Sequence, residues 1–478
     1  MALRDRTFQT RRMNRPGVPE PERAQAIAPS LEQPAQGSLE RQNPVVERPR
    51  MALSRDVVEL KYRIYDRMVR EIDPARLTTD LSPEEARRAV EDAVLELIEQ
   101  EGANVSRIDQ LTLMREIADE VVGFGPIEPL LQDDDVTEIM VNRPDGVFYE
   151  KGGTLHLSDR QFRDDDHIMR LIEKIVSPLG RRIDESSPMV DARLPDGSRV
   201  NAIIPPLAIH GPSITIRKFA KRAYTDADLI RFGTITSSMA ELLRACVYSR
   251  LNVLISGGTG SGKTTFLNVL SSYISNRERI VTIEDPAELQ LKQENWVSLE
   301  TRPANIEGRG QVVQRDLVRN ALRMRPDRII VGECRAGEAF DMLQAMNTGH
   351  DGSLTTVHAN TPRDSLSRIE NMVLMANLEL PARAIREQIS SAINVVIQLS
   401  RLPDGTRRVT HITEIVGMEQ DVITMHDIFT FVQSGVEANG QVIGHMQPTG
   451  IRPLFADKLE RSGMPLPPDL FQLHRYSA

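Results

Sequence analysis

A glycine-rich stretch near the middle of the chain constrains the fold more than any other feature. It follows the apolar run 251–255, which predicts a buried strand, and it precedes residues 266–274, which predict a helix. Its spacing is that of the G-x-x-x-x-G-K-[ST] phosphate-binding loop, in the strand–loop–helix context that such a loop requires. The residues of the loop are Gly257, Gly258, Thr259, Gly260, Ser261, Gly262, Lys263, Thr264 and Thr265.

The residue types in this loop suit a nucleoside triphosphate with Mg²⁺. Glycines let successive backbone N–H groups turn toward a phosphate, and the following helix adds its positive N-terminal end. We expect Lys263 to reach the β and γ oxygens and the Thr264 hydroxyl to occupy one coordination position on Mg²⁺. A glycine turn that contains Lys-Thr by chance is the weaker alternative, because the full pattern stands in its required context.

Composition narrows the possible partners. The chain has 478 residues with a net charge of −9, and only 4% of them are aromatic. An acidic balance with few stacking side chains argues against a nucleic-acid partner. Its two cysteines, Cys246 and Cys334, are isolated and cannot form a C-x-x-C zinc site. No apolar run approaches the roughly 20 residues of a membrane span, so we expect membrane association only through partners.

Changes of composition and periodicity divide the chain into segments. A proline-rich, mixed-charge tail is expected to be disordered, and three amphipathic helices, an α+β domain and an α/β domain follow it. The last segment has no legible function. The expected bounds are 1–54 for the tail, 55–120 for the helical bundle, 121–220 for the α+β domain, 221–236 for a linker, 237–431 for the α/β domain and 432–478 for the C-terminal tail.

The helical bundle shows no residues with evident chemistry, and its expected role is docking or packing on its neighbour. Its apolar residues recur every three or four positions, as on the buried face of a helix. The third helix is expected to start near Ser106 and to bury Ile108, Leu111, Met114 and Ile117.

Acidic residues follow two of the buried strands predicted in the α/β domain. Glu284 comes after the strand 279–283, and Glu333 comes after the strand 328–331. Carboxylates at the ends of parallel strands can hold the water shell of Mg²⁺ or polarise an attacking water. For Glu284, an acidic loop or helix cap remains an equal alternative.

Two histidines bracket the predicted strand 354–357. His358 follows the strand, and beside a phosphate loop we expect it to contact the γ-phosphate or to sense its loss. His350 precedes the strand, and for it a structural role and a functional role remain equally open.

Arginines in the preceding α+β domain are candidates for the second half of the site. Arg193, Arg199 and Arg217 lie on predicted strands of that domain. A guanidinium that a second domain brings to a γ-phosphate completes the site in many ATPases, and it makes domain closure depend on the nucleotide. The alternative is that each arginine is simply solvated.

Four sequence blocks together resemble the type II/type IV secretion ATPases, which are hexameric motors of secretion and of pilus assembly and retraction. The blocks are the loop 257–265, the acidic segment 283–288, the run 323–333 and the two-histidine segment 348–360. A finer resemblance, carried by 191–206 and 213–219, is to the tight-adherence (Tad) pilus motors, the CpaF/TadA branch. The four-cysteine zinc module of many pilus-extension ATPases is impossible with two cysteines.

This resemblance implies an α/β fold with a RecA-like ATPase domain at 237–431 and a PAS-like domain at 121–220. ATP is expected between the two domains of a homohexameric ring. By resemblance, Glu284 and Glu333 contact Mg²⁺ and the attacking water, and His358 contacts the nucleotide.

The same resemblance gives the arginines and the phosphate loop their roles. It implies that Arg193 helps bind the nucleotide, and that Arg199 and Arg217 act in catalysis. Lys263 and Thr264 are implied to contact the phosphates, with Thr264 also on Mg²⁺.

The leading hypothesis is a cytoplasmic ATP-hydrolysing motor that assembles a Tad pilus through an inner-membrane platform protein, with retraction left open. It would be peripheral at that membrane and would bind no nucleic acid directly. A type IV secretion traffic ATPase that moves protein or DNA is the first alternative. A RecA-like nucleic-acid translocase and a nucleotide-binding scaffold without turnover are further alternatives.

Overall fold

The computed structural model describes residues 54–71, 82–101, 105–219, 223–304, 308–376 and 378–472. The tail predicted to be disordered lies outside this range up to residue 53, as do residues 220–222 around the start of the predicted linker. Within these ranges, no helix combines the length and the apolar character that crossing a membrane requires.

The first helices of the described chain pack into a small bundle. Helix α3 begins with a capping box, in which the Ser82 hydroxyl accepts from the Glu85 backbone N–H while the Glu85 carboxylate accepts from that of Ser82. The core includes Leu113 and Ile117. The helices are α1 (Arg55–Glu71), α3 (Pro83–Gln100) and α4 (Arg107–Val121).

The predicted buried stripe of α4 is wrong in its first half. Ile108 and Leu111 are 62% and 47% exposed, whereas Leu113 and Ile117 are fully buried. At about 3.6 residues per turn, the face that Leu113, Ile117 and Val121 share turns Ile108 and Leu111 toward solvent. The helix itself starts after Ser106, as predicted.

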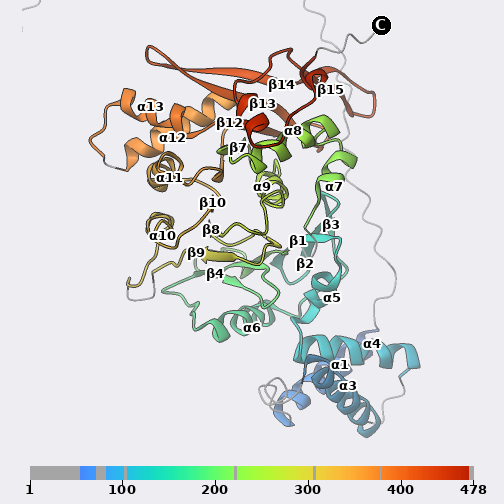
Figure 1. The fold of residues 1–478 in the computed structure, drawn as a ribbon. Coiled ribbons are helices and arrows are strands. Elements are labelled where there is room, and N and C mark those ends of the chain that lie inside the picture. The colour runs from blue at the N-terminus through green and yellow to red at the C-terminus, as the bar shows by residue number, and fades with distance from the viewer. Residues whose placement is uncertain are drawn as a thin grey trace, which may run out of the picture. The chain divides into compact units, whose positions relative to one another are not determined.

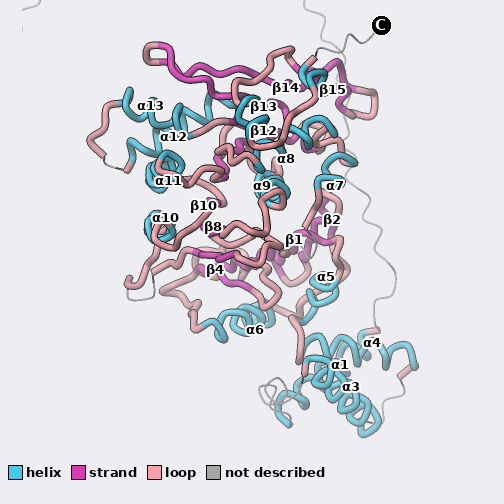
Figure 2. Tube along the Cα trace, viewed as in Figure 1, coloured by secondary structure: helices cyan, strands magenta, loops and turns pink. Residues whose placement is uncertain are grey.

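An antiparallel sheet of six strands follows the bundle (Figures 1 and 2). Its strand order is β3-β2-β1-β6-β5-β4. Every second side chain along the strands is apolar and points to the same face of the sheet, where helix α6 (Asp165–Val176) packs on it. The opposite face of the sheet carries polar side chains. The strands are β1 (Val136–Arg143), β2 (Gly146–Lys151), β3 (Thr154–Leu157), β4 (Met189–Arg193), β5 (Arg199–Ile203) and β6 (Ser213–Arg217), and the short helix α5 (Glu128–Gln132) precedes them.

The second sheet has nine strands in the order β15-β14-β13-β12-β7-β11-β10-β8-β9. The strands from β12 to β9 in this order are parallel, and β12 to β15 form an antiparallel extension. The parallel strands are β7 (Val253–Gly257), β8 (Ile280–Glu284), β9 (Trp296–Glu300), β10 (Arg328–Val331), β11 (Leu354–Val357) and β12 (Val395–Arg401). The others are β13 (Arg407–Glu419), β14 (Val422–Val436) and β15 (Val442–Pro448).

Helices cover both faces of the parallel strands. One hydrophobic cluster joins α8 and α9 to side chains such as Val253 and Ile255 of β7, and the other joins α10 to α13 to the intervening Leu254. Strands buried on both faces explain the continuous apolar runs of the sequence. The helices are α7 (Asp226–Arg231), α8 (Ser237–Tyr248), α9 (Lys263–Ser271), α10 (Gln314–Ala321), α11 (Glu338–Asn347), α12 (Pro362–Met375), α13 (Ala382–Ala392) and α14 (Ala456–Arg461).

The predicted α/β fold class is confirmed: a part with a parallel sheet covered by helices on both faces is preceded by an α+β part and a helical bundle. The division into domains stays a prediction. Strand β14 runs through residue 431, where the sequence analysis ends the ATPase domain, and α7 lies within the predicted linker. The pairing of β13 with β14 contains register shifts. Apolar and polar residues therefore do not alternate strictly along these strands, and this alternation is the sequence signal that predicts a strand.

Candidate functional site

The carboxyl ends of four neighbouring parallel strands meet at one edge of the larger sheet. These strands are β7, β11, β10 and β8, and they lead into the phosphate loop, His358, Glu333 and Glu284 respectively. Segments that lie as far as about 100 residues apart in the chain therefore converge at the place where an open parallel sheet usually binds its ligand.

Two positions of the phosphate loop require glycine, Gly257 because a side chain would clash and Gly262 because of its backbone conformation. A Cβ on Gly257 would lie 2.5 Å from the Ser261 hydroxyl oxygen and 2.7 Å from the Leu399 carbonyl oxygen. Gly262 has a φ of 92°, in the left-handed region, where it forms the N-cap of α9. Arg407 of β13 donates to the Gly260 carbonyl at 2.9 Å, which ties the loop to the antiparallel extension.

Lys263 lies across the loop that carries it. Its Nζ donates to the carbonyl oxygens of Gly257 and Gly258 at 2.9 and 3.0 Å. Burial lowers the pKa of the Lys263 ammonium, and the Glu333 carboxylate opposes this shift. The first backbone N–H groups of α9 have no acceptor within the helix, so they are available to an anion beside Lys263.

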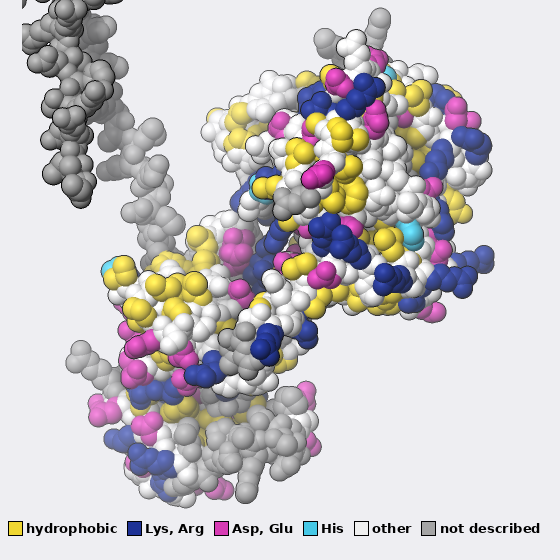
Figure 3. Space-filling view, turned by 90° about the vertical axis from the view of Figure 1, so that its left-hand side faces the viewer, with side chains coloured by type: hydrophobic (Ala, Val, Ile, Leu, Met, Phe, Trp, Pro, Cys, Tyr) yellow, Lys and Arg dark blue, Asp and Glu magenta, His cyan; other side chains and the backbone are white. Residues whose placement is uncertain are grey.

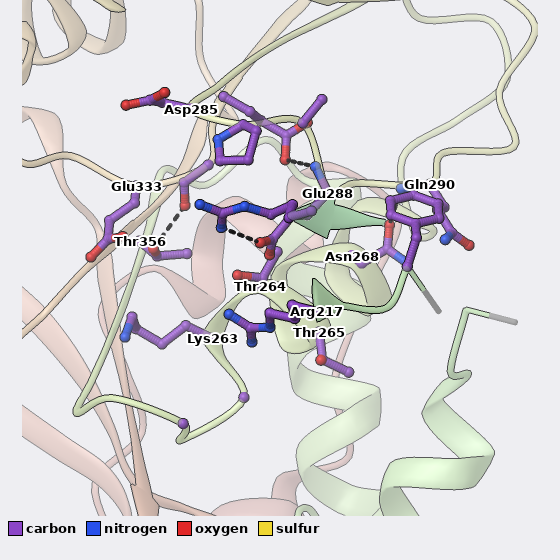
Figure 4. Close-up of a pocket in the computed structure, with 18 of the residues that line it drawn as sticks. Arg217, Lys263, Thr264, Thr265, Asn268, Asp285, Glu288, Gln290, Glu333 and Thr356 are labelled. Carbon is purple, nitrogen blue, oxygen red and sulfur yellow. Dashed lines mark hydrogen bonds and ion pairs between the residues drawn. The ribbon is translucent and has the colours of Figure 1, made fainter. Parts of the chain in front are cut away.

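A cavity of about 470 Å³ opens in front of the loop, and residues of both sheets line it (Figure 4). From the α/β part it receives Thr259 to Thr265, together with Glu284, Glu333 and His358. Arg199 and Arg217 enter from the six-stranded sheet. In Figure 4 the Arg217 side chain points into this space beside Lys263 and Thr264, and Figure 3 shows Lys and Arg side chains interspersed with Asp and Glu side chains over one face.

The three predicted arginines form a row across the polar face of the six-stranded sheet. Arg193 on β4 is directly opposite Arg199 on β5, which is directly opposite Arg217 on β6. Like charges that face each other across strands destabilise a sheet. Such a row is therefore favoured only where anionic groups compensate it.

Carboxylates compensate the arginine row. Arg199 lies 3.3 Å from Glu288, and Arg193 lies 3.1 Å from Glu300. Both acids belong to the α/β part, so these ion pairs connect the two sheets. Arg217 has a longer contact of 3.9 Å to Glu138 of its own sheet. Arg193 also donates to the Ala287 carbonyl but does not line the cavity, so the structure brings Arg199 and Arg217 to the loop and leaves Arg193 beside it.

Glu284 is a buried carboxylate with two different oxygens. It is 2% exposed, and its Oε1 accepts from the backbone N–H groups of Glu288 and Leu289 at 2.9 and 3.0 Å. Its Oε2 has no hydrogen-bond partner among the described protein atoms. Burial raises the pKa of Glu284 to about 7, against the two backbone hydrogen bonds. Oε1 thus holds the backbone of the acidic segment in place, and Oε2 remains available to a ligand.

Replacing Glu284 with glutamine is expected to flatten the dependence of stability on pH. The raised pKa means that the folded chain holds a proton that the unfolded chain releases near pH 4.5, so stability falls as pH rises from about 4.5 through 7. At pH 8 the Glu284→Gln variant should be more stable by about 3 kcal/mol, because glutamine keeps the accepting oxygen without the buried charge. Thermal unfolding without nucleotide at pH 5 and pH 8 measures this, and equal pH dependence in both proteins would contradict it.

Glu333 and His358 lie at the phosphate end of the cavity. The Glu333 Oε2 accepts from Arg335, whose Nη2 is 2.8 Å away. The pKa of His358 is lowered by burial and then by the charges of Lys263 and Arg368, which favours the neutral imidazole. A neutral imidazole offers one N–H donor and one acceptor nitrogen to a phosphate or to a water.

Several residues that line the cavity are not among the site residues predicted from the sequence. Glu288 lies in the recognised acidic segment, but its pairing with Arg199 needs the fold. Asn268 stands four residues after Thr264 on α9, and this helical spacing could have revealed it. Arg335 follows Glu333 closely in the sequence and received no role. His350 does not line the cavity, and its carbonyl accepts from the Ser353 hydroxyl.

The residues present fit a nucleoside triphosphate with Mg²⁺. Donors for phosphate come from the loop backbone and Lys263, and oxygen donors for a hard cation come from Thr264, Glu333 and the unpartnered Oε2 of Glu284. In the part of the chain that the structure describes, no group of three or more His, Cys, Asp or Glu side chains could hold a metal by itself.

The chain is similar to known proteins. The family described as Type II/IV secretion system protein matches residues 120–438. A Mycobacterium tuberculosis protein whose name assigns it to conjugal transfer is 36% identical over 340 residues, which are 66% of this chain and 96% of that protein. The type IV secretion system protein PtlH of Bordetella pertussis is 36% identical over 308 residues, covering 59% of this chain and 91% of its own. Among solved structures, the VirB11 ATPase from the Brucella suis type IV secretion system is 29% identical, covers 60% of this chain and 94% of its own, and has a TM-score of 0.33.

Proposed function

The chain belongs to the Type II/IV secretion system protein family, and we propose that it hydrolyses ATP and converts the hydrolysis into motion between its two sheets. The observation that carries this proposal is the cavity that the phosphate loop shares with Arg199 and Arg217 of the other sheet. Within the proposal, the PAS-like domain at 121–220 and the ATPase domain at 237–431 are the two moving bodies.

Each residue of the site has a task in this proposal. Lys263 and the loop backbone hold the β- and γ-phosphates, and Arg217 neutralises charge that develops on the γ-phosphate. Glu333 polarises the attacking water, with neutral His358 beside it. Bound Mg²⁺, with Thr264 among its ligands, would supply charge neutralisation between the phosphates.

Motion follows from the position of the arginine row. A triphosphate adds negative charge between the loop and the row, which draws the two sheets together. Loss of the γ-phosphate removes part of that charge and leaves the weaker contacts of Arg199 to Glu288 and Arg193 to Glu300. These pairs are partly exposed, and pairs of that kind contribute only about 0–1 kcal/mol each, so product release is expected to loosen the closed state.

Replacing Arg217 with alanine is expected to lower turnover about tenfold while ATP still binds. Lys263 and the loop backbone remain to hold the phosphates, and Arg199 remains as a neighbouring cation, so the loss is partial. Steady-state hydrolysis together with equilibrium ATP binding measures both quantities. Arg143→Ala, an exposed arginine of the same sheet that pairs with Asp145, is the matched control. Turnover equal to that of the control would remove the arginine row from the mechanism.

The proposed cargo system is type IV secretion or conjugation. Relatives that are 36% identical bear names that assign them to conjugal transfer and to type IV secretion. The motor would then move protein or DNA across the inner membrane through membrane-embedded partners. A homohexameric ring on the cytoplasmic side of that membrane completes this proposal, since heterologous contacts between copies close into rings.

A Tad pilus motor is the second candidate. The runs 191–206 and 213–219, which form β4 to β6 and carry the arginine row, are the part of the sequence that favours it. In that case the partner is an inner-membrane platform protein and the cargo is pilin.

A chromosomal Lys263→Ala replacement distinguishes the two cargo systems. Loss of surface pili with normal DNA and protein transfer would support the pilus motor, whereas loss of transfer with normal pili would support the secretion motor. Retention of both activities would contradict the proposal of a motor in either system.

A further inference from the structure

Arg335 is held in place by its backbone and extends its side chain into the cavity. The backbone N–H groups of Arg335 and Ala336 donate to Oε1 of Glu338 at 2.6 and 2.8 Å. Glu338 is 4% exposed at the start of α11, so this anchor is rigid. The Arg335 side chain is 57% exposed and lines the cavity. Neither Arg335 nor Glu338 is among the site residues predicted from the sequence.

The guanidinium of Arg335 lies between acids that follow two different strands. Its Nε and Nη2 donate to Oε2 of Glu333 at 3.0 and 2.8 Å, so both hydrogen bonds reach the same carboxylate oxygen. Its Nη1 lies 4.0 Å from Asp285 after β8. A carboxylate oxygen that accepts two charge-assisted hydrogen bonds is a poor proton acceptor, so this pair opposes the role proposed for Glu333.

The pair lies within the electrostatic reach of the phosphate end of the cavity. The charges of Glu333 and Arg335 both act on the Lys263 ammonium, and the charge of Glu333 also acts on His358. Phosphate oxygens bound at Lys263 would therefore compete directly with Glu333 for the guanidinium. Arginine suits such an exchange, because its planar fork pairs equally well with carboxylate and phosphate.

The exposure of the pair makes this exchange feasible. The side chains of Arg335 and Glu333 are 57% and 27% exposed. An ion pair this exposed changes an equilibrium by no more than about fivefold. A triphosphate with several negative charges can overcome a factor of this size.

We propose that Arg335 is a positioning residue that senses the triphosphate and controls Glu333. Arg335 holds Glu333 in the ion pair seen in the structure, and bound phosphate draws the guanidinium away and frees Glu333 to polarise the attacking water. Hydrolysis thereby waits for a correctly seated γ-phosphate. This inference rests on the proposed function and adds a control step to it.

The test is a double-mutant cycle on nucleotide affinity, measured with the full chain and a non-hydrolysable ATP analogue. Glu333→Gln weakens the ion pair and should tighten analogue binding about two- to fivefold. In an Arg335→Gln background the same Glu333→Gln change should tighten binding by less than about 1.5-fold, because no guanidinium is left to transfer. Arg319→Gln is the matched control background, since Arg319 pairs with Asp341 at 2.9 Å and does not line the cavity.

Equal tightening of analogue binding in the Arg335→Gln and Arg319→Gln backgrounds would overturn the inference, because Glu333 would then act only by its own charge.

Steady-state kinetics give a second criterion. Arg335→Gln should raise KM with kcat retained within about threefold, and Arg335→Lys should recover part of the affinity. A kcat as low as that of Glu333→Gln would instead make Arg335 catalytic and also overturn it. Failure of the unaltered chain to bind the analogue would refute the proposed function itself, which separates the two failures.

Discussion

The Lys263→Ala variant is expected to lose at least about 100-fold in ATP turnover, with ATP binding weakened as well. Lys263 is the cation of the phosphate loop, and its half-buried ammonium donates to the loop carbonyls of Gly257 and Gly258. Alanine at this position leaves the backbone donors of α9 but removes the charge that reaches the γ-phosphate. A colorimetric phosphate assay with the full chain measures turnover.

The control for this experiment is Lys292→Ala. Lys292 is an exposed lysine of the same sheet region that does not line the cavity. We expect this variant to retain the activity of the unaltered chain. Hydrolysis undiminished in Lys263→Ala would exclude the loop at 257–265 as the catalytic site.

Glu333→Gln is expected to bind ATP and hydrolyse it about 100- to 10,000-fold more slowly. Glutamine keeps the shape of the side chain but cannot take a proton from water. Its backbone should stay in place, because the flanking Gly332 carbonyl accepts from the Thr356 hydroxyl at 2.7 Å and the Cys334 N–H donates to the Thr356 carbonyl at 2.9 Å. Rapid-quench measurement of a single turnover separates chemistry from product release.

Glu370→Gln provides the comparison for Glu333→Gln. Glu370 also pairs with an arginine, Arg386, at 2.9 Å, but it belongs to α12 and lies outside the cavity lining. We expect normal turnover from this variant. Glu333→Gln with a single-turnover rate equal to that of Glu370→Gln would show that another group polarises the water, and Glu284 with its unpartnered Oε2 would be the next candidate.

Much of the fold and the phosphate half of the site could be predicted from the sequence. The apolar runs predict the buried strands, and the polar residues that end these runs mark the carboxyl ends of the strands. Because the carboxyl ends of parallel strands lie at one edge of the sheet, the sequence predicts that Glu284, Glu333 and His358 lie close together. The strand bounds of 328–331 and 354–357 agree with the structure residue for residue. The roles assigned to these side chains stay predictions until the variants are measured.

The pairing between elements could not be predicted in the same way. The row of Arg193, Arg199 and Arg217 depends on strand register, which a sequence does not state. The contacts of Arg199 with Glu288 and of Arg335 with Glu333 depend on how loops from different strands settle beside one another. The different environments of the two Glu284 carboxylate oxygens also could not be predicted from the sequence. They depend on how deeply the side chain is buried and on which backbone N–H groups point toward it.

The claim that a triphosphate draws the six-stranded sheet and the phosphate loop together is tested most directly by a distance. Cys246 and Cys334 are both buried, so spin labels can be placed selectively on Thr154→Cys of β3 and Ala438→Cys of the β14–β15 turn. Labelled chain is diluted into unlabelled chain, both carrying Glu333→Gln, so that only distances within one chain are seen. We expect ATP to narrow the distance distribution and move it to shorter values, and exchange for ADP to reverse the change. Identical distributions with ATP, with ADP and without nucleotide, under conditions where ATP binding is saturated, would contradict it.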